Sequence, residues 1–313
     1  MVASLHSVRA AGFSLLVFLV GCGGAVVVDG EPDDTSSTGS SSSSSSNSSS
    51  SGGPDIPGEW TTLIDGTWEL AAGTEGYWCA RKTFPEDLYI KAFRALAPPG
   101  THHTLLLRDG GQPDGEQACG PTLGSNMFYA SGVGTDDLVF PDGIAVKIPA
   151  GTQLQLNLHL FNTSTSPLSG VSGTLVKLVP ASEVKQSAEM ILPGTASISV
   201  PPFGTQTVEG DCAFPAASTI STVWPHMHKY GTHMKVTYEG AGGSKVLHDG
   251  AFTFGEQKNY AIEPLLVGPG EVIRIECSYK NTTGQTINWG DSSEAEMCFA
   301  GIYRYPALKQ ACQ

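Results

Sequence analysis

The segment Thr152–Leu160 constrains the fold more than any other stretch of the chain, because its polar and apolar side chains alternate. Leucine occupies every second position from Leu154 to Leu160, and Gln, Asn and His stand between them. A period of two is typical of a β-strand that turns one face toward a hydrophobic core. We therefore predict a strand whose leucines enter the core of a β-sandwich and whose polar face displays His159. Such a histidine can be a metal ligand on a rigid element or a residue that merely faces solvent.

The composition agrees with an all-β fold. Only 15% of the 313 residues are charged, and the chain contains 38 Gly and 20 Pro with few long stretches of helical periodicity. This length allows one large domain or two of ordinary size. Further strands are predicted at 78–81, 88–93, 101–107, 173–179, 197–200, 234–238 and 272–276, and residues 182–191 could form a short helix. The net charge of −13 argues against nucleic-acid binding, which needs a basic surface.

The N-terminus has the pattern of a bacterial lipoprotein signal peptide. Arg9 precedes the apolar run 11–21, which is too short to span a bilayer as a helix. The run ends in Leu19-Val20-Gly21-Cys22, which resembles a lipobox, in which the cysteine is lipidated and becomes the new N-terminus. An ordinary signal peptide with a chance cysteine is the alternative. Because Gly23 follows rather than Asp, we expect a lipid anchor in the outer membrane of the bacterial cell envelope, with no other membrane contact.

A segment that cannot fold follows Cys22. Residues 35–52 are almost wholly Ser, with Thr, Gly and Asn, so they have no apolar surface to offset the entropy of ordering and behave as a flexible tether. We expect a signal peptide at 1–21, a lipid-anchored disordered linker at 22–57, and folded domains at 58–180 and 181–313.

The cysteine count indicates disulfides. With Cys22 set aside for lipidation, six of the seven cysteines remain: Cys79, Cys119, Cys212, Cys277, Cys298 and Cys312. An even number in an exported chain is typical of a disulfide framework, and six cysteines allow fifteen pairings. No Cys-x-x-Cys pair occurs, which argues against a structural zinc site or a thioredoxin-like motif.

Histidines gather in three places along the chain. His226 and His228 lie one residue apart, so in an extended chain they point the same way and can share one metal ion. The alternative is a surface or hydrogen-bonded pair. Adjacent residues of a regular strand face opposite ways, so His102 and His103 can share a metal only if the backbone twists after the turn at 97–100. His159 is the third place, and His248, in a Gly-flanked turn, is expected at the surface.

Met297 adds a thioether to these imidazoles. It lies among acidic and small residues, where it has no obvious apolar neighbours, although most methionines fill gaps in a core. Imidazole with thioether is a soft, mixed ligand set that favours copper, whereas zinc sites use His, Cys and carboxylates. No His-Glu-x-x-His spacing, nucleophile elbow or phosphate-binding glycine loop occurs.

The order of these residues resembles that of a known family. The set His102-His103, His159, His226-x-His228 and Met297-Cys298 is similar to that of the copper type II, ascorbate-dependent monooxygenases, which include the peptidylglycine α-hydroxylating and dopamine β-monooxygenases. The resemblance covers about residues 70–313 and extends to Ser-Ser followed by Glu-Met-Cys. It implies two jelly-roll-like β-sandwich domains packed side by side, each with one copper ion, across a solvent-filled cleft.

The resemblance also implies a division of roles between the two coppers. His102, His103 and His159 would hold the electron-donating copper. The expected catalytic residues, His226, His228 and Met297, would hold the copper that binds dioxygen and abstracts hydrogen. Ascorbate or another one-electron reductant would supply two electrons, so that one oxygen atom enters a C–H bond and the other leaves as water. The expected protein is a monomeric dicopper monooxygenase whose partners are dioxygen and a small-molecule substrate.

Further expectations concern disulfides and substrate. The family framework implies the pairs Cys79–Cys119, Cys212–Cys312 and Cys277–Cys298. Tyr77 matches a family tyrosine, whereas Trp224 and Gly301 replace an arginine and a tyrosine that bind substrate in the peptide-hydroxylating member. Tyr77 and Trp224 are therefore expected substrate contacts in a wider, more apolar cleft, suited to an apolar or aromatic small molecule, unless Lys229 or Arg304 supplies a new anchor.

Two other classes of function remain open. A surface copper-binding lipoprotein could retain the six ligands without turnover, and copper binding alone does not distinguish it from the enzyme. A jelly-roll module that binds carbohydrate or a protein partner would leave the spaced ligands unexplained.

Overall fold

The computed structural model describes residues 59–122 and 126–309. In these ranges the regular elements are the strands β1 to β21 and one 3-10 turn, η1 (Ala181–Glu183), so the all-β prediction is confirmed. No helix in this part of the chain has the length and hydropathy that a bilayer span requires. The predicted signal peptide, Cys22 and the Ser-rich linker lie outside the described residues.

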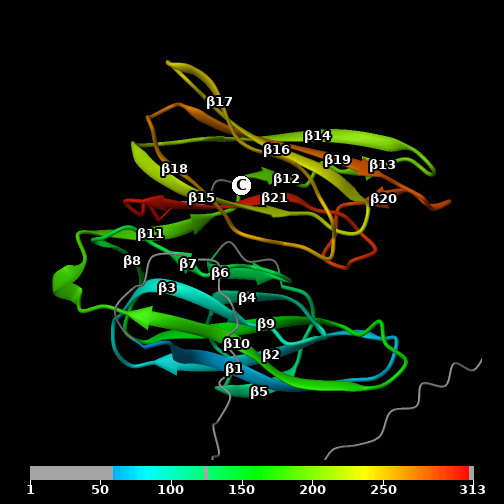
Figure 1. Cartoon of the computed structure of the whole chain (residues 1–313), viewed down its shortest axis with the longest axis horizontal. Coiled ribbons are helices and arrows are strands. Elements are labelled where there is room, and N and C mark those ends of the chain that lie inside the picture. The colour runs from blue at the N-terminus through cyan, green and yellow to red at the C-terminus, as the bar shows by residue number, and fades with distance from the viewer. Residues whose placement is uncertain (1–58, 123–125, 310–313) are drawn as a thin grey trace, which may run out of the picture. The chain divides into compact units, whose positions relative to one another are not determined.

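The strands of the described ranges form four sheets (Figure 1). The ten-stranded sheet contains β1 (Thr61–Leu70), β3 (Leu88–Leu96), β7 (Leu138–Val139), β8 (Ile144–Ile148), β10 (Leu168–Leu178), β11 (Gln186–Ile191), β12 (Gly194–Thr195), β15 (Ser218–His226), β18 (Tyr260–Val267) and β21 (Cys298–Tyr305). The five-stranded sheet contains β2 (Glu75–Phe84), β4 (Thr101–Asp109), β5 (Gly115–Ala118), β6 (Met127–Gly132) and β9 (Thr152–Phe161). The four-stranded sheet contains β14 (Thr205–Ala213), β16 (Gly231–Gly240), β17 (Gly243–Ala251) and β19 (Val272–Lys280), and β13 (Ser199–Val200) pairs with β20 (Ile287–Asn288).

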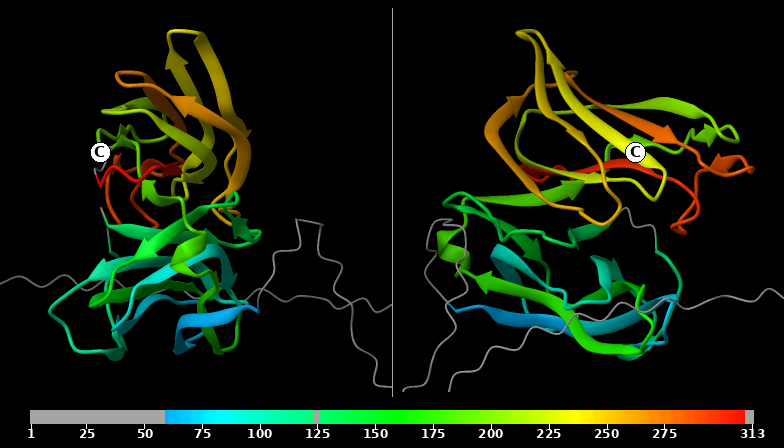
Figure 2. Two further views of the ribbon diagram at one scale, coloured as in Figure 1. Left: turned by 90° about the vertical axis from the view of Figure 1, so that its left-hand side faces the viewer. Right: turned by 45° about the vertical axis from the view of Figure 1, so that its right-hand side comes forward.

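The sheets pack in layers around two hydrophobic cores. The five-stranded sheet packs against the β1–β10–β3 part of the ten-stranded sheet, and the four-stranded sheet packs against its β21–β15–β18 part (Figure 2). The leucines of β9 enter the first core: Leu154, Leu156 and Leu158 are fully buried, and Leu160 is 3% exposed. The inward face predicted from the alternation is therefore confirmed.

The opposite face of β9 is buried as well, although we expected it to be displayed. Asn157 is 0% exposed and His159 is 2% exposed. The amide of Asn157 donates to the Gly120 carbonyl at 3.0 Å and to Thr122 Oγ1 at 3.1 Å. The segment after β5 thus covers this face, and two of its oxygens accept from the Asn157 Nδ2 group. Among the described atoms Asn157 Oδ1 has no hydrogen-bond partner.

Two local predictions are wrong. Residues 182–191 form η1 and then β11, in which Ala188 and Met190 are buried while Ser187 and Glu189 are partly exposed, the period of a strand. His248 does not lie in a turn but within β17, where its ring packs on Tyr260 with centroids 4.7 Å apart. Each of the other predicted strand segments overlaps an observed strand.

The ten-stranded sheet runs through the predicted domain boundary. η1 lies at that boundary, and β11 after it pairs parallel with β8 and antiparallel with β21. The first core also takes Trp224 and Tyr303 from the C-terminal half of the chain. The two halves therefore share a sheet and core residues, and the division into domains at 180 and 181 stays a prediction.

Two of the three predicted disulfides are present. Cys79–Cys119 joins residues 40 positions apart, and Cys277–Cys298 joins residues 21 positions apart. Cys212 is buried, and its predicted partner Cys312 lies outside the described residues, so that pairing stays a prediction. The Cys277–Cys298 bridge ties β19 to the residue that follows Met297.

Replacing Cys277 and Cys298 together by serine is expected to lower the free energy of unfolding by about 3 kcal/mol, the value for a loop of about 20 residues in the chain-entropy model. Urea unfolding under non-reducing conditions measures the loss. The paired replacement of Cys79 and Cys119 is the matched control and should cost about 4 kcal/mol, since its loop is longer. Losses below about 1 kcal/mol in both variants would contradict a stabilising role for these bridges.

Candidate metal centres

The first ligand set comes from β4 and β9, which are neighbours in the five-stranded sheet. A register shift between Thr101 and His103 breaks the regular alternation of β4, and it turns the adjacent His102 and His103 toward one point. His159 stands opposite His103 on β9. The twist that the sequence required at this place is therefore present, and all three histidines are buried.

The three Nδ1 atoms converge. Nδ1 of His103 lies 3.1 Å from Nδ1 of His102 and 3.3 Å from Nδ1 of His159. A metal held about 2.0 Å from each imidazole nitrogen in tetrahedral geometry separates its ligand atoms by about 3.3 Å. The spacing of the three nitrogens therefore fits a single metal ion.

Oxygen acceptors hold the outer nitrogens of two of these rings. Nε2 of His102 lies 2.8 Å from the Phe254 carbonyl, and Nε2 of His159 lies 2.6 Å from Glu75 Oε1. Since an oxygen acceptor requires the Nε2–H tautomer, the Nδ1 atoms of both rings carry lone pairs. Lone pairs directed at one buried point need a cation between them, and this arrangement supports the fit of a metal.

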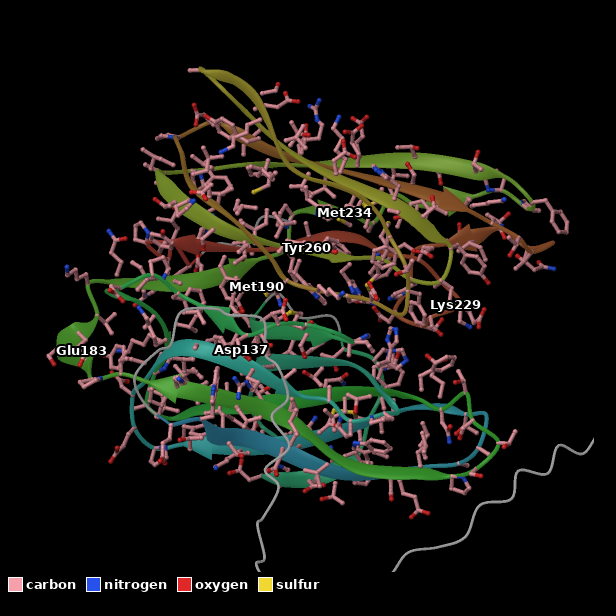
Figure 3. The ribbon with its side chains drawn as sticks, viewed as in Figure 1. Asp137, Glu183, Met190, Lys229, Met234 and Tyr260 are labelled. Carbon is pink, nitrogen blue, oxygen red and sulfur yellow. A yellow bond between two sulfur atoms is a disulfide. The ribbon has the colours of Figure 1, made fainter. Side chains whose placement is uncertain are left out.

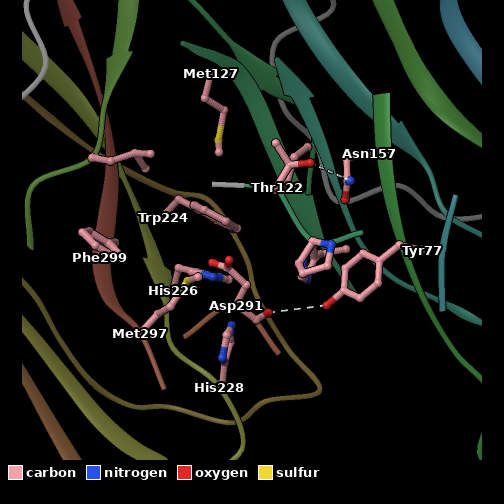
Figure 4. A pocket seen from close by; sticks show the side chains of 14 residues that line it. Tyr77, Thr122, Met127, Asn157, Trp224, His226, His228, Asp291, Met297 and Phe299 are labelled. Atoms are coloured by element: carbon pink, nitrogen blue, oxygen red, sulfur yellow. Dashed lines mark hydrogen bonds between the residues drawn. The ribbon is translucent and has the colours of Figure 1, made fainter. Parts of the chain in front are cut away.

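The second ligand set lies around the start of β21. His226 ends β15, His228 follows in the next turn, and Met297 directly precedes Cys298. The rings of His226 and His228 lie 5.3 Å apart at 90°, and both line one pocket with Met297 (Figure 4). Met297 is 5% exposed, so its thioether is buried but lines that pocket rather than being enclosed by the core.

Outer contacts leave the Nε2 atoms of this set available. Nδ1 of His226 lies 2.8 Å from Gln257 Oε1, and Nδ1 of His228 lies 3.2 Å from the Ala295 carbonyl. The lone pairs of these two rings are therefore on Nε2. Two imidazole nitrogens with a thioether in the same pocket form a donor set that fits copper.

Glu296 fixes the backbone that carries the second set. Its side chain is 0% exposed and accepts hydrogen bonds from the backbone N–H groups of His228, Tyr230, Gly231 and Met297 at 2.6 to 3.2 Å. Burial raises the pKa of Glu296 to about 7, and the four N–H donors oppose that shift. One buried carboxylate thus holds both the His228 turn and Met297.

The two ligand sets face one pocket and approach each other closely. Its walls are Tyr77, His103, Leu105, Pro121, Thr122, Met127, Asn157, Leu192, Trp224, His226, His228, Asp291, Met297 and Phe299. The space between these walls has a cavity volume of about 40 Å³. The rings of His103 and His226 are perpendicular with centroids 5.8 Å apart. The family resemblance implied a solvent-filled cleft between the sets, but at this point the two rings leave no such gap.

Burial keeps the histidines of both sets neutral. It lowers the pKa of His102 and His226 to about 4 and the pKa of His228 to about 3. The pKa of His103 is well below its ordinary value for the same reason, and the pKa of His159 is lowered by burial against the opposing hydrogen bond to Glu75. Neutral imidazole is the form that binds metals.

The metal-free protein is therefore expected to lose stability below about pH 6.5. Histidines in the unfolded chain have a pKa near 6.5. Between that value and about pH 4 the unfolded chain binds more protons than the folded one, so the free energy of unfolding falls as the pH falls. Each pKa unit corresponds to about 1.4 kcal/mol per histidine.

Thermal unfolding of the metal-free protein from about pH 8 to about pH 4.5 measures this loss. A His233→Gln variant is the control, because His233 is partly exposed beside Asp249 and belongs to neither set. It should keep the wild-type profile. A melting temperature that stays constant between about pH 7 and about pH 5 would contradict the buried, neutral histidines.

The predicted substrate contacts have other partners in this structure. Tyr77 lines the pocket, stacks on His159 with centroids 4.6 Å apart, and donates to the Asp291 carbonyl at 3.5 Å. Trp224 is 1% exposed and stacks on His226, and its indole N–H donates to the Gln257 carbonyl at 3.3 Å. Tyr77 therefore presents a polar group near the pocket, whereas the Trp224 donor is already used.

The extra room expected at Gly301 is absent. A Cβ at Gly301 would lie 2.6 Å from Met190 Cε and 3.0 Å from Trp224 Cε3. Met190, which Figure 3 labels, comes from β11 and occupies the space that a larger side chain would need. The prediction of a wider cleft at this point is wrong, because a residue from another strand fills it.

Both alternative anchors are engaged elsewhere. The Arg304 side chain is fully buried and donates to Glu189 Oε1 at 2.8 and 2.6 Å. Lys229 pairs with Glu294 and lies over the Phe161 ring at 5.9 Å. Neither residue lines the pocket.

Comparison with known proteins agrees with the geometry. Residues 186–313 match the family model of the copper type II ascorbate-dependent monooxygenase, C-terminal domain. The matched range includes His226, His228 and Met297, and the family of this model is the one that the sequence resembles. Comparison with curated proteins finds no match.

Proposed function

Since residues 186–313 carry the C-terminal domain of the copper type II, ascorbate-dependent monooxygenases, we propose that the chain is a dicopper hydroxylase of small substrates. The observation that carries this proposal is the pocket shared by two ligand sets, one with three converging imidazole nitrogens and one with two imidazoles and a thioether. His102, His103 and His159 would hold one copper ion, and His226, His228 and Met297 would hold the other.

Copper at these places would supply one-electron transfer at the first set and dioxygen activation at the second, with ascorbate or another one-electron reductant as the electron source. The residues of the chain orient the ligands for this work. Gln257 and the Ala295 carbonyl bind Nδ1 of His226 and His228, which leaves Nε2 of each ring free for a metal. Glu296 binds the backbone N–H of Met297. The soft thioether favours Cu(I), the state that reacts with dioxygen. His103 of the first set and His226 of the second set are in direct ring contact, with centroids 5.8 Å apart.

The pocket favours an apolar or aromatic substrate without a carboxylate. Leu105, Met127, Leu192 and Phe299 form apolar walls, and no Lys or Arg belongs to its lining. Asp291 lines it too, and among the described atoms its buried Oδ1 has no hydrogen-bond partner. A substrate carboxylate would meet this acid instead of the guanidinium that best binds such a group. We therefore expect glycine-extended peptides to be poor substrates, with Tyr77 as one of the polar contacts of the substrate.

We also propose that the enzyme lies in the bacterial cell envelope, where Cys22 anchors it to the outer membrane, and that it acts as a monomer. The apolar run ending in Leu-Val-Gly-Cys and the Ser-rich tether support this placement, and disulfides are typical of exported proteins. Metabolic labelling with a radioactive fatty acid, lost in a Cys22→Ala variant, tests the anchor.

The activity test uses copper-loaded protein with ascorbate, dioxygen and a panel of neutral aromatics, phenylalkylamines and glycine-extended peptides. We expect substrate-dependent oxygen consumption matched by a product that gains one oxygen atom from labelled dioxygen. Neutral aromatics or phenylalkylamines should react and the peptides should not. Tight binding of two copper ions without any oxygenated product would instead support the copper-binding lipoprotein.

A further inference from the structure

Glu75 contacts residues from both halves of the chain. It begins β2, and its Oε1 accepts from Nε2 of His159 at 2.6 Å. The hydroxyl of Ser293, more than two hundred residues further along the chain, donates to Oε1 at 2.9 Å and to Oε2 at 2.8 Å. Tyr77, two residues after Glu75 and on the same face of β2, donates to the neighbouring Asp291 carbonyl at 3.5 Å. Glu75 and Tyr77 of β2 therefore bind the segment 291–293 at two points.

This segment leads directly to the second ligand set. Ser293 is 1% exposed and stands four residues before Met297. Between them lies Glu296, which holds the backbone of Met297 and of His228. The Glu75 carboxylate therefore binds His159, a ligand of the first set. It also binds Ser293, in the segment that leads to Met297 of the second set.

We propose that Glu75 is a positioning residue that aligns His159 for metal binding and, through Ser293, couples the first ligand set to the segment that presents Met297. A carboxylate on the outer nitrogen of a metal-binding histidine fixes the ring and its tautomer, and loss of such a partner costs about 10- to 100-fold in metal affinity. Through its hydrogen bonds to Ser293, the same carboxylate links the N-terminal half of the chain to the C-terminal half. The inference rests on the proposed function for the identity of the metal, which is copper.

The test compares Glu75→Ala, Glu75→Gln and Ser293→Ala in the full chain, with Glu86→Ala as the control because Glu86 is an exposed acid soon after β2. The first set is titrated alone with Cu(I) against a chromophoric chelator in a His226→Ala background. Hydrogen exchange of peptides covering residues 289–297 is followed separately in the metal-free protein without that background.

We expect Glu75→Ala to weaken Cu(I) binding at the first set about 10- to 100-fold and to speed exchange at 289–297. Glu75→Gln, which keeps one oxygen acceptor, should lose less than about tenfold. Ser293→Ala should speed the same exchange as Glu75→Ala while Cu(I) affinity stays within about threefold, and the double variant should exchange no faster than either single one.

An affinity of Glu75→Ala within about threefold of wild type would overturn the alignment of His159. If Ser293→Ala left hydrogen exchange at residues 289–297 unchanged, or if Glu86→Ala changed it equally, the proposed coupling through Glu75 and Ser293 would be wrong. Both measurements are independent of turnover. A wild-type protein that binds Cu(I) but hydroxylates nothing would therefore sink the proposed function and leave the role of Glu75 to be decided by these variants.

Discussion

Replacing Met297 with isoleucine leaves a folded protein and lowers ascorbate-dependent turnover by at least about 100-fold. Isoleucine keeps the bulk of a side chain that is 5% exposed, so the melting temperature should change by only a few degrees. It removes the soft sulfur ligand, and loss of even an outer partner of a metal costs about 10- to 100-fold. Cu(I) titration and oxygen consumption of the same preparation measure both consequences.

Met127→Ile is the matched control for this prediction. Met127 lines the same pocket and is 9% exposed, but it belongs to neither ligand set. It should retain two copper ions and turnover within about tenfold of wild type, a range that allows for altered substrate packing. If Met297→Ile unfolds the protein while the copper affinity of the remaining fold is unchanged, Met297 is a core residue and the proposed second site is wrong.

Replacing His103 with alanine should reduce bound copper from two ions per chain to one and abolish turnover. His103 is the central member of the first set, since its Nδ1 is the nitrogen closest to both His102 and His159. The second set keeps its own ligands, so one Cu(I) should still bind there. Metal analysis after copper loading and gel filtration gives the stoichiometry.

The converse variant His226→Ala should also retain one copper ion, held by the first set. His233→Ala, at a partly exposed histidine paired with Asp249, should retain two. If His103→Ala released both ions, the two sets would not be independent sites, and if it retained both, the convergence of the three imidazoles would have no metal-binding role.

Local chemistry explains what could be predicted from the sequence. The leucine alternation of Thr152–Leu160 defines a strand with one apolar face, and a core forms there whatever lies around it. His102 and His103 could be placed at a backbone irregularity because adjacent side chains cannot otherwise face one point, and the register shift in β4 is present. The two sets of ligands could be grouped because their order along the chain resembles a known family.

Contacts between distant residues could not be predicted in the same way. Glu75 lies 84 residues from His159 and 218 residues from Ser293. Gln257 lies 31 residues from His226 in a loop without periodicity. A single acid or amide in a polar stretch carries no local sign of a buried partner, because its environment is set by sheet packing. Among these residues Glu296 was the easiest to associate with the site from the sequence, since it stands directly before the candidate ligand Met297.

The polar face of β9 and the space at Gly301 show the same limit. Polar side chains at alternate positions predict an exposed face, but the segment after β5 covers it and accepts hydrogen bonds from Nδ2 of Asn157. A glycine in place of a tyrosine predicts added room, yet Met190 from β11 fills that room. In both cases a residue far along the chain determines the burial.

Diffraction from copper-loaded crystals, recorded on both sides of the copper absorption edge, tests the dicopper centre most directly. The anomalous difference map should contain two copper peaks per chain. One should lie within bonding distance of Nδ1 of His102, His103 and His159, and the other near Nε2 of His226 and His228 and the sulfur of Met297. A single peak, or a metal in either place that shows the absorption edge of zinc alone, would contradict a dicopper monooxygenase.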